Sequence, residues 1–271
     1  MPSPTDIDRS VGPLYCGIDL AQGGQAVTVI TIAQYIDKNP AKLHIMHATK
    51  SEEWRTDELA QFLIDTLHDY EPDHIIVDNG GNNAVKQILQ KEYGDKIKEC
   101  WLGEQKQPLD LDKLSEENLI TVNKPDMMQR LVDLFTTPGP DGKPRIIIPL
   151  TTKHEWLIDH YTADECVMTE TVARPNTMRY KRMKGRQDDA LMSLLFLYIG
   201  YLVSVDYSQG SIGIGAPGSS FFIDERTGEH VTQTWDEPRP GVRTNFQETR
   251  TPPEDRGVTY KIDAPLNPHT V

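Results

Sequence analysis

Acidic residues border apolar segments at three points of the chain, where they could hold metal ions. Asp19 and Asp78 each end a short apolar segment, whereas Asp188 and Asp189 open the most apolar run, DDALMSLLFLYIGY. Carboxylates seldom enter a protein core unless they are paired or bind a metal. Converging carboxylates without basic partners repel one another, and an all-oxygen site favours Mg²⁺ or Mn²⁺. Two such ions, about 4 Å apart, can promote attack of water on a phosphodiester and stabilise the leaving oxygen.

Each acid taken singly has a more ordinary explanation. An aspartate that ends a strand is often only a turn former, and Asp188 could simply cap the helix that follows it. The metal hypothesis gains weight because these acids occur together, in this order, beside a strongly basic segment.

That basic segment is RPNTMRYKRMKGR, residues 174–186, which contains no acid. It could bind a polyanion, and we expect its cations to contact phosphate groups without reading sequence. The predicted DNA-binding side chains are Arg174, Arg179, Lys181, Arg182, Lys184 and Arg186.

Local patterns predict the elements that must position these side chains. Residues 14–20, 25–34 and 42–48 form short apolar segments, and the short links between them favour a meander of three antiparallel strands. After Ser51, a candidate helix cap, apolar residues recur at helical spacing as far as Tyr70.

Strands and helices are expected to alternate farther along the chain. Strands are predicted at 74–78, 97–102, 145–150 and 165–173, and helices at 82–94, 125–135, 151–161 and 187–203. The polar, acidic residues 103–124 are expected to form a loop or a small insert. This order predicts an α/β fold, in which a mixed sheet of three antiparallel strands followed by β-α alternation is flanked by helices.

The expected sheet brings the acids together. Ligand sites in open α/β sheets gather beyond the strand ends, so Asp19 and Asp78 would be neighbours if their strands pair. The late helix would bring Asp188 and Asp189 to the same point.

Composition limits the class of protein. The chain has 271 residues, of which 37% are hydrophobic and 25% charged, as expected for one sizeable core with an appendage. No apolar run reaches the roughly 18 residues of a membrane span, and the N-terminus does not resemble a signal peptide. The three separated cysteines suggest neither a disulfide framework nor a zinc site. We expect a reduced, cytoplasmic protein that does not associate with membranes.

The chain divides into three expected parts. Residues 1–12 are a flexible lead-in, 13–204 a regular domain, and 205–271 a tail rich in Gly and Pro. Within the tail, residues 221–235 could form one hairpin. The net charge of −13 argues against a protein coated in nucleic acid, but leaves room for a local basic track.

The motifs GIDLAQGG, VDNGGNN and DDALMSLLFLYIGY together resemble the nuclease domain of large terminase subunits of tailed bacteriophages, over residues 12–204. The resemblance implies a ribonuclease H-like fold that cuts double-stranded, concatemeric DNA with two divalent ions during genome packaging. By position, Asp19 would bridge both ions, Asp78 and Asp189 would be further ligands, and Asp188 an accessory ligand. The basic segment would form the arm or hairpin that grips DNA.

Two departures from that family bear on the interpretation. Gln25 stands where some members carry another acid, so one metal ligand would be missing or replaced by water. The chain also lacks the G-x-x-x-x-G-K-[ST] phosphate loop of an ATPase motor. A separate packaging ATPase subunit and a portal are therefore the expected partners, in the host cytoplasm if the protein is viral, and the tail is a candidate docking segment.

Three alternative interpretations remain open. Gly23, Gly24, Gly80 and Gly81 could cradle nucleotide phosphates as in actin-like ATPases and sugar kinases. Those folds separate the two loops by an inserted subdomain and duplicate the domain, unlike this chain. A second alternative is another ribonuclease H-like nuclease, such as a junction resolvase. A third is a non-catalytic descendant that binds DNA or scaffolds a complex.

Other polar residues are given simpler roles. His154 and His160 do not share a helical face at the spacing of a metal pair, and both are expected at the surface. Lys153 and Lys181 could approach the site and stabilise phosphate charge.

Overall fold

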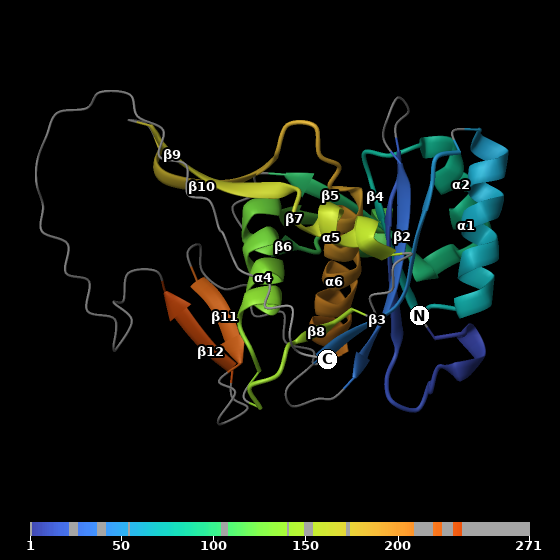
Figure 1. The fold of residues 1–271 in the computed structure, drawn as a ribbon, viewed down its shortest axis with the longest axis horizontal. Coiled ribbons are helices and arrows are strands. Elements are labelled where there is room, and N and C mark those ends of the chain that lie inside the picture. The colour runs from blue at the N-terminus through green and yellow to red at the C-terminus, as the bar shows by residue number, and fades with distance from the viewer. Residues whose placement is uncertain are drawn as a thin grey trace, which may run out of the picture.

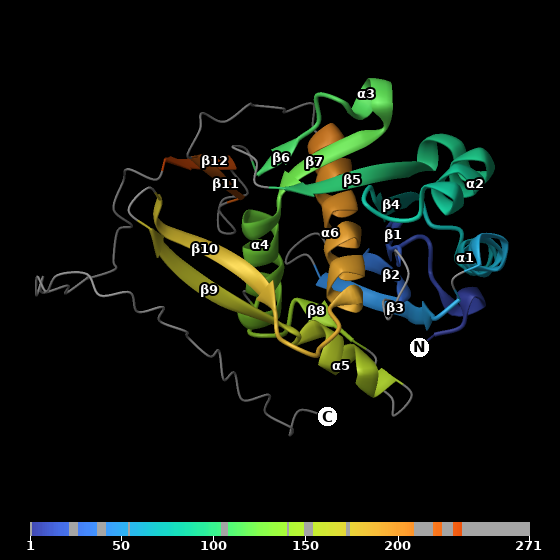
Figure 2. The same ribbon diagram turned by 90° about the horizontal axis from the view of Figure 1, so that it is seen from above.

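The structure of the chain is a computed structural model. The structure describes residues 2–21, 27–36, 42–53, 55–103, 108–139, 141–148, 154–171, 174–208, 219–223 and 230–234. Figures 1 and 2 show a central mixed sheet with helices on both of its faces.

The central sheet has eight strands in the order β6-β7-β5-β4-β1-β2-β3-β8. Strands β1, β2 and β3 pair antiparallel as the predicted meander, and β4, β5 and β7 continue parallel to β1. The bounds are β1 Leu14–Asp19, β2 Thr28–Ile36, β3 Lys42–Ser51, β4 His74–Asp78, β5 Ile97–Gly103, β6 Leu109–Asp110, β7 Leu119–Asn123 and β8 Ile146–Ile147. The sequence predicted this mixed sheet, in which three antiparallel strands are followed by strands that alternate with helices.

The helices form one layer on each face of the sheet (Figure 1). Helices α1 (Thr56–Tyr70) and α2 (Asn83–Tyr93) cover one face, and α6 (Asp189–Ser208) covers the other, with α4 (Lys124–Thr136) and α5 (Glu155–Tyr161) beside it. Short helical turns lie at η1 Pro4–Asp6, η2 Gly94–Lys96 and α3 Leu114–Glu117. Two separate hairpins join β9 (Asp164–Thr171) to β10 (Arg174–Arg182), and β11 (Ser219–Ile223) to β12 (His230–Thr234).

Helix α6 packs directly on β1. Most side chains of its first three turns are buried, because the helix is apolar on nearly every side. Gly17 permits a close approach, since a Cβ there would lie 1.9 Å from the Ser193 carbonyl oxygen. The Ser193 Oγ lies 2.8 Å from the Gly17 carbonyl oxygen and 2.8 Å from Thr31 Oγ1. These contacts bring the start of α6 toward the end of β1.

Two predictions about local structure were wrong. Residues 103–124 contribute β7 to the main sheet, where Ile120 and Val122 are buried on alternate positions. That alternation is a strand signal, but it spans too few residues to stand out in a polar segment. Ser51 belongs to β3 rather than capping a helix, because α1 begins at Thr56 with Arg55 at its N-cap.

Several other predictions concern segment boundaries and the tail. The predicted hairpin of the tail is present as β11 and β12, and α6 extends past residue 204 to Ser208. The helix predicted from 151 is described from Glu155. Gln25, Lys153 and residues 235–271 lie outside the described residues. In the described part of the chain, no helix is long and apolar enough to cross a membrane.

Candidate metal centre

Asp19 and Asp78 lie side by side at the carboxyl edge of the sheet. Strands β1 and β4 are parallel, and the pair formed by Ile18 and Val77 directly precedes the two acids. The turn after β4 packs against the end of β1, because a Cβ on Gly81 would lie 2.4 Å from Leu20 Cβ. The sequence predicted that these acids would be neighbours if their strands paired, and the pairing of β1 with β4 brings them together.

A network of polar side chains fixes the turn that follows Asp78. The Gly80 N–H donates to Asp78 Oδ1 at 3.0 Å. Beneath the turn, the buried Lys86 Nζ donates to the Glu99 carboxylate at 2.7 Å and to the Asn79 carbonyl oxygen at 2.6 Å. Burial raises the pKa of Asp78, whereas the Gly80 hydrogen bond and the Lys86 charge lower it. The protein thus holds Asp78 in one orientation while leaving its charge partly uncompensated.

The start of α6 adds Asp188 and Asp189 to the same place. The Met192 N–H donates to the Asp188 carbonyl oxygen at 2.9 Å, so Asp188 lies at the N-terminal boundary of the helix. Burial is the first cause that raises the pKa of Asp19 well above its ordinary value, and the charges of Asp189, Asp78 and Asp188 raise it further. Asp78, Asp188 and Asp189 are therefore all close enough to Asp19 to disfavour its charge.

A fifth carboxylate, Asp164, joins this group, and the sequence analysis missed it. Burial, followed by the charge of Asp188, raises the pKa of Asp164 to about 6. Its Oδ1 and Oδ2 are buried and have no hydrogen-bond donor among the described residues, and neither does Oδ2 of Asp189. No spacing or motif marks Asp164 in the sequence, because it reaches the site only through the course of β9.

Basic side chains offset part of this negative charge. Lys124, the first residue of α4, lowers the pKa of Asp19, Asp78 and Asp164. Arg182 forms an ion pair with Asp188, with 3.2 Å between Nη1 and Oδ1. The sequence analysis assigned Arg182 to DNA and did not consider Lys124 at all.

The basic segment forms β10 and the turn that leads to α6. The β9–β10 hairpin lies beside α4, where the Tyr180 hydroxyl donates to Gln129 Oε1 at 2.7 Å (Figure 2). The side chain of Arg174 lies outside the described part of the structure. The other predicted DNA-binding side chains are exposed; they are Arg179, Lys181, Arg182, Lys184 and Arg186. Arg186 also donates to the Thr162 carbonyl oxygen at 3.4 Å.

The prediction that His160 is a surface residue was wrong. His160 is 5% exposed, and its ring meets Trp156 edge-on, with 5.1 Å between the ring centroids. Its Nδ1 accepts the Ala190 N–H at 3.2 Å, so the ring proton belongs on Nε2 and the imidazole is neutral. Nδ1 lies 3.9 Å from Asp189 Oδ2. His160 thus satisfies a backbone donor in the first turn of α6, next to a candidate metal ligand.

The chemistry of these donors fits a hard divalent cation. The site offers carboxylate oxygens from β1, β4, β9 and α6, including buried oxygens that lack a donor. In the described part of the chain, no three carboxylate, histidine or cysteine side chains form a complete ligand set. The fit to a metal centre thus lies in the chemistry of the donors, which are carboxylate oxygens.

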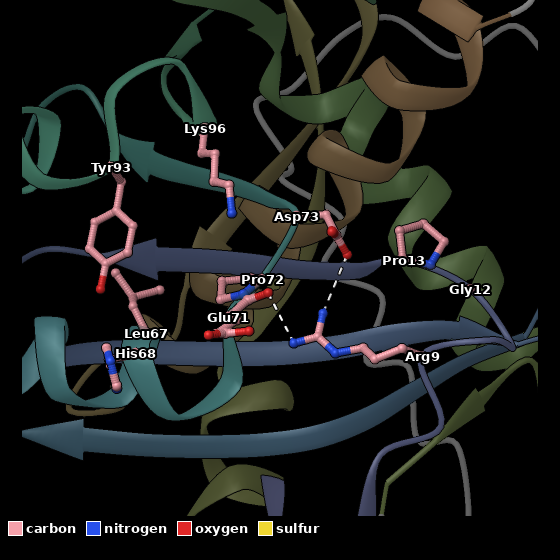
Figure 3. A pocket seen from close by; sticks show the side chains of 10 residues that line it. All are labelled: Arg9, Gly12, Pro13, Leu67, His68, Glu71, Pro72, Asp73, Tyr93 and Lys96. Carbon is pink, nitrogen blue, oxygen red and sulfur yellow. Dashed lines mark hydrogen bonds and ion pairs between the residues drawn. The ribbon is translucent and has the colours of Figure 1, made fainter. Parts of the chain in front are cut away.

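A cavity of about 670 Å³ lies away from these acids (Figure 3). It opens where β1 and β4 begin, between the start of the chain and the end of α1. Arg9 crosses it and donates to the Glu71 carbonyl oxygen at 3.0 Å, with Asp73 3.6 Å away. The full lining is Arg9, Gly12, Pro13, Leu67, His68, Glu71, Pro72, Asp73, Tyr93 and Lys96. Because this is the opposite edge of the sheet, the cavity is not part of the candidate centre.

The chain has distant likenesses among solved structures. No family model and no curated protein sequence matches the chain. The large terminase nuclease from thermophilic phage G20c is 15% identical, with 70% of this chain and 83% of that chain covered and a TM-score of 0.46. The nuclease domain of the large terminase subunit gp2 of bacterial virus Sf6 is 13% identical, covering 68% and 86%, with a TM-score of 0.46.

A third solved structure extends this comparison. Thermus thermophilus RuvC is 13% identical, with 48% of this chain and 86% of that chain covered and a TM-score of 0.30. At these values the likeness is distant and identifies no residue of the site. Terminase nuclease domains, the family that the sequence motifs resemble, are nevertheless among the solved structures to which this chain is similar.

Proposed function

We propose that this protein is a divalent-metal-dependent endonuclease that hydrolyses phosphodiester bonds of double-stranded DNA. One observation supports the proposal most strongly: carboxylates from separate elements converge at the carboxyl edge of the sheet, and some of their buried oxygens have no donor in the described structure. Buried carboxylates in such an arrangement are costly unless a cation neutralises them. A cluster of this kind therefore needs a functional reason to exist.

The proposed centre uses the acids in distinct roles. Asp19, Asp78 and Asp189 would hold two Mg²⁺ or Mn²⁺ ions, with Asp188 as an accessory ligand. When bound, the ions would promote attack by water on the phosphodiester and stabilise the leaving oxygen, so no protein nucleophile is needed. The cleaved strand would end in a 3′-hydroxyl.

The contribution of the chain itself is rigid positioning. Asp19 and Asp78 are held by paired strands, and Asp189 by a helix whose side chains are largely buried. The hydrogen bond from Gly80 orients Asp78, and the contact of His160 with Ala190 orients the first turn of α6. Lys124 would supply positive charge close to the substrate phosphate.

The β9–β10 hairpin would bind the DNA backbone. Arg179 and Lys181 are exposed on β10, and Lys184 is exposed in the turn that leads from β10 to the acids of α6. Because such side chains contact phosphates rather than bases, we expect cleavage with little sequence selectivity. The predicted contacts of Arg174, Arg182 and Arg186 would add to the same track.

The biological setting that we propose is viral genome packaging. The motif resemblance supports a nuclease that cuts concatemeric DNA, which would take place in the host cytoplasm. A separate packaging ATPase subunit and the portal would be its partners. Residues 13–204 would form the nuclease domain and residues 205–271 the docking tail.

The first test is cleavage of supercoiled plasmid with Mg²⁺, with Mn²⁺ and with chelator. We expect nicking and linearisation that require the metal, and at least a hundredfold loss of the rate in Asp78→Asn, because one ligand oxygen loses its charge. Asp65→Asn, on α1 at the opposite face of the sheet, is the matched control and should cut like the unmodified protein.

The alternatives predict other outcomes of this test. A well-folded protein that cuts with neither metal would contradict the proposal and favour a DNA-binding or scaffolding role. The nucleotide-binding alternative relies on Gly23 and Gly24, which lie outside the described residues, and on Gly81, which is packed against Leu20. Cutting that Asp78→Asn retains in full would place the chemistry elsewhere.

A further inference from the structure

Asp164 lies at the base of the β9–β10 hairpin, next to the start of α6. It is the first residue of β9, and its partner across the hairpin is Arg182. The Met183 N–H donates to the Ala163 carbonyl oxygen at 2.8 Å, which closes the base of the hairpin. Since only a short turn separates Met183 from Asp188, this closure holds Asp164 beside the acids of α6.

The carboxylate of Asp164 is buried without a donor. Both of its oxygens are inaccessible to solvent, and no described residue donates a hydrogen bond to either. The carboxyl group of Asp188 faces it within hydrogen-bonding reach, but a carboxylate can only accept. Two facing carboxylates repel unless a cation or a proton lies between them.

A second buried oxygen supports the same conclusion. The Asp189 side chain is only 10% exposed, and its Oδ2 also has no partner among the described residues. Asp164 and Asp189 lie on different elements, and Asp188 lies close to both. Both carboxyl groups with unpartnered oxygens therefore lie near Asp188, where an oxygen-seeking cation would offset their negative charge.

Among the described residues, Lys124 and Arg182 lower the pKa of Asp164 through their charge, but neither donates a hydrogen bond to it. Arg182 extends to Asp188 rather than to Asp164, and its side chain is 56% exposed. Lys124 acts on Asp164 through its charge, but no hydrogen bond joins them in the described structure. A divalent cation, by contrast, binds carboxylates at short range and needs no donor geometry.

We propose that Asp164 is a metal ligand, which together with Asp188 holds a divalent cation at the junction of the hairpin and α6. This inference rests on the proposed nuclease function in one respect, since the ion would be one of the two that the centre uses. Ligation from β9 would also couple the DNA-binding hairpin to the metal centre, because the same strand pair carries Asp164 and the basic residues.

The experiment measures Mn²⁺ binding to the full chain, without DNA, by the electron paramagnetic resonance signal of free Mn²⁺. We expect Asp164→Asn to bind one ion fewer, or to bind its weakest ion at least tenfold less tightly than the unmodified protein. Glu165→Gln is the matched control, because it removes a neighbouring carboxylate whose backbone partner on the hairpin is Lys181. The control should bind like the unmodified protein.

The outcomes separate this inference from the proposed function. Equal number and affinity of ions in Asp164→Asn and the unmodified protein would overturn the inference, as would an unmodified protein that binds no Mn²⁺. If Asp164→Asn does not fold, Asp188→Asn is measured instead, and unchanged binding there overturns it. A protein that binds Mn²⁺ through Asp164 but cuts no DNA would overturn the proposed function alone.

Discussion

At the scale of single residues, the site consists of carboxylates whose burial works against their charge. The pKa of Asp19, Asp78, Asp164 and Asp189 is raised, with burial as the first cause in each case. Without a bound cation, this arrangement costs folding free energy at neutral pH. These residues therefore lower the stability of the metal-free protein, and a bound cation would restore it by neutralising their charge.

The Asp164 carboxyl group predicts how stability depends on pH. Its pKa is about 6 in the folded protein against an ordinary value of 3.8, so the folded state holds the proton more tightly than the unfolded state. Its stabilising contribution is therefore complete below pH 3.8 and is lost as the pH rises through 6.

Asp164→Asn should remove this loss. In chelator and between acidic and neutral pH, the free energy of unfolding should fall more in the unmodified protein than in the variant. The difference should be less than about 3 kcal/mol, because partial solvent exposure screens the charge. Equal pH dependence in the two proteins would mean that Asp164 is not buried as described.

At the scale of elements, the centre depends on how α6 is held. Gly17 allows the helix to touch β1, and Ser193 connects the helix to β1 and β2. His160, from α5, accepts the Ala190 N–H in the first turn. The start of the helix is thereby fixed from two directions, which determines where Asp189 can reach.

Two substitutions of His160 separate the hydrogen bond from packing. Asparagine can place an acceptor oxygen where Nδ1 lies, whereas glutamine extends too far, and both remove the ring. We expect the free energy of unfolding of His160→Gln to be about 1–2 kcal/mol lower than that of His160→Asn, because a buried N–H loses its acceptor in the glutamine variant.

The affinity for Mn²⁺ tests whether His160 positions Asp189, which the free energy of unfolding alone cannot show. His160→Asn should retain affinity near that of the unmodified protein, while His160→Gln should bind severalfold more weakly. If both variants bind Mn²⁺ equally, the contact with Ala190 does not position Asp189.

At the scale of the whole molecule, opposite charges are segregated around one edge of the sheet. The chain carries a net charge of −13, yet its basic hairpin leads directly into the acidic centre. DNA would approach along the hairpin, and its phosphates would meet the carboxylates only through bound cations. The negative charge of the remaining surface would disfavour binding elsewhere.

The hairpin predicts a salt-dependent affinity for DNA. Replacing both Lys181 and Lys184 by glutamine should weaken binding in chelator and reduce the slope of log affinity against log salt by about 2. Fluorescence anisotropy with a labelled duplex measures both. The control replaces Lys91 on α2 and Lys143 in the turn before β8, which are both exposed, and should leave the slope unchanged. An unchanged slope in the hairpin variant would place the DNA track elsewhere.

Local patterns alone determined much of this protein. The meander, the strand that ends at Asp78 and the long apolar helix could be predicted, because hydrophobic periodicity and turn residues act over neighbouring positions. Their order then made Asp19, Asp78, Asp188 and Asp189 candidates for one site, since parallel strands end at the same edge of a sheet.

Only the tertiary structure decided which other residues join that site. Lys124 is far from His160 and Asp164 in the sequence, all three are far from Asp19 and Asp78, and no spacing distinguishes them from surface residues. They reach the site because the hairpin base, α4 and α5 pack around the start of α6. Burial then gives Asp164 a raised pKa and makes His160 a neutral acceptor, since both depend on desolvation by segments far away in the chain.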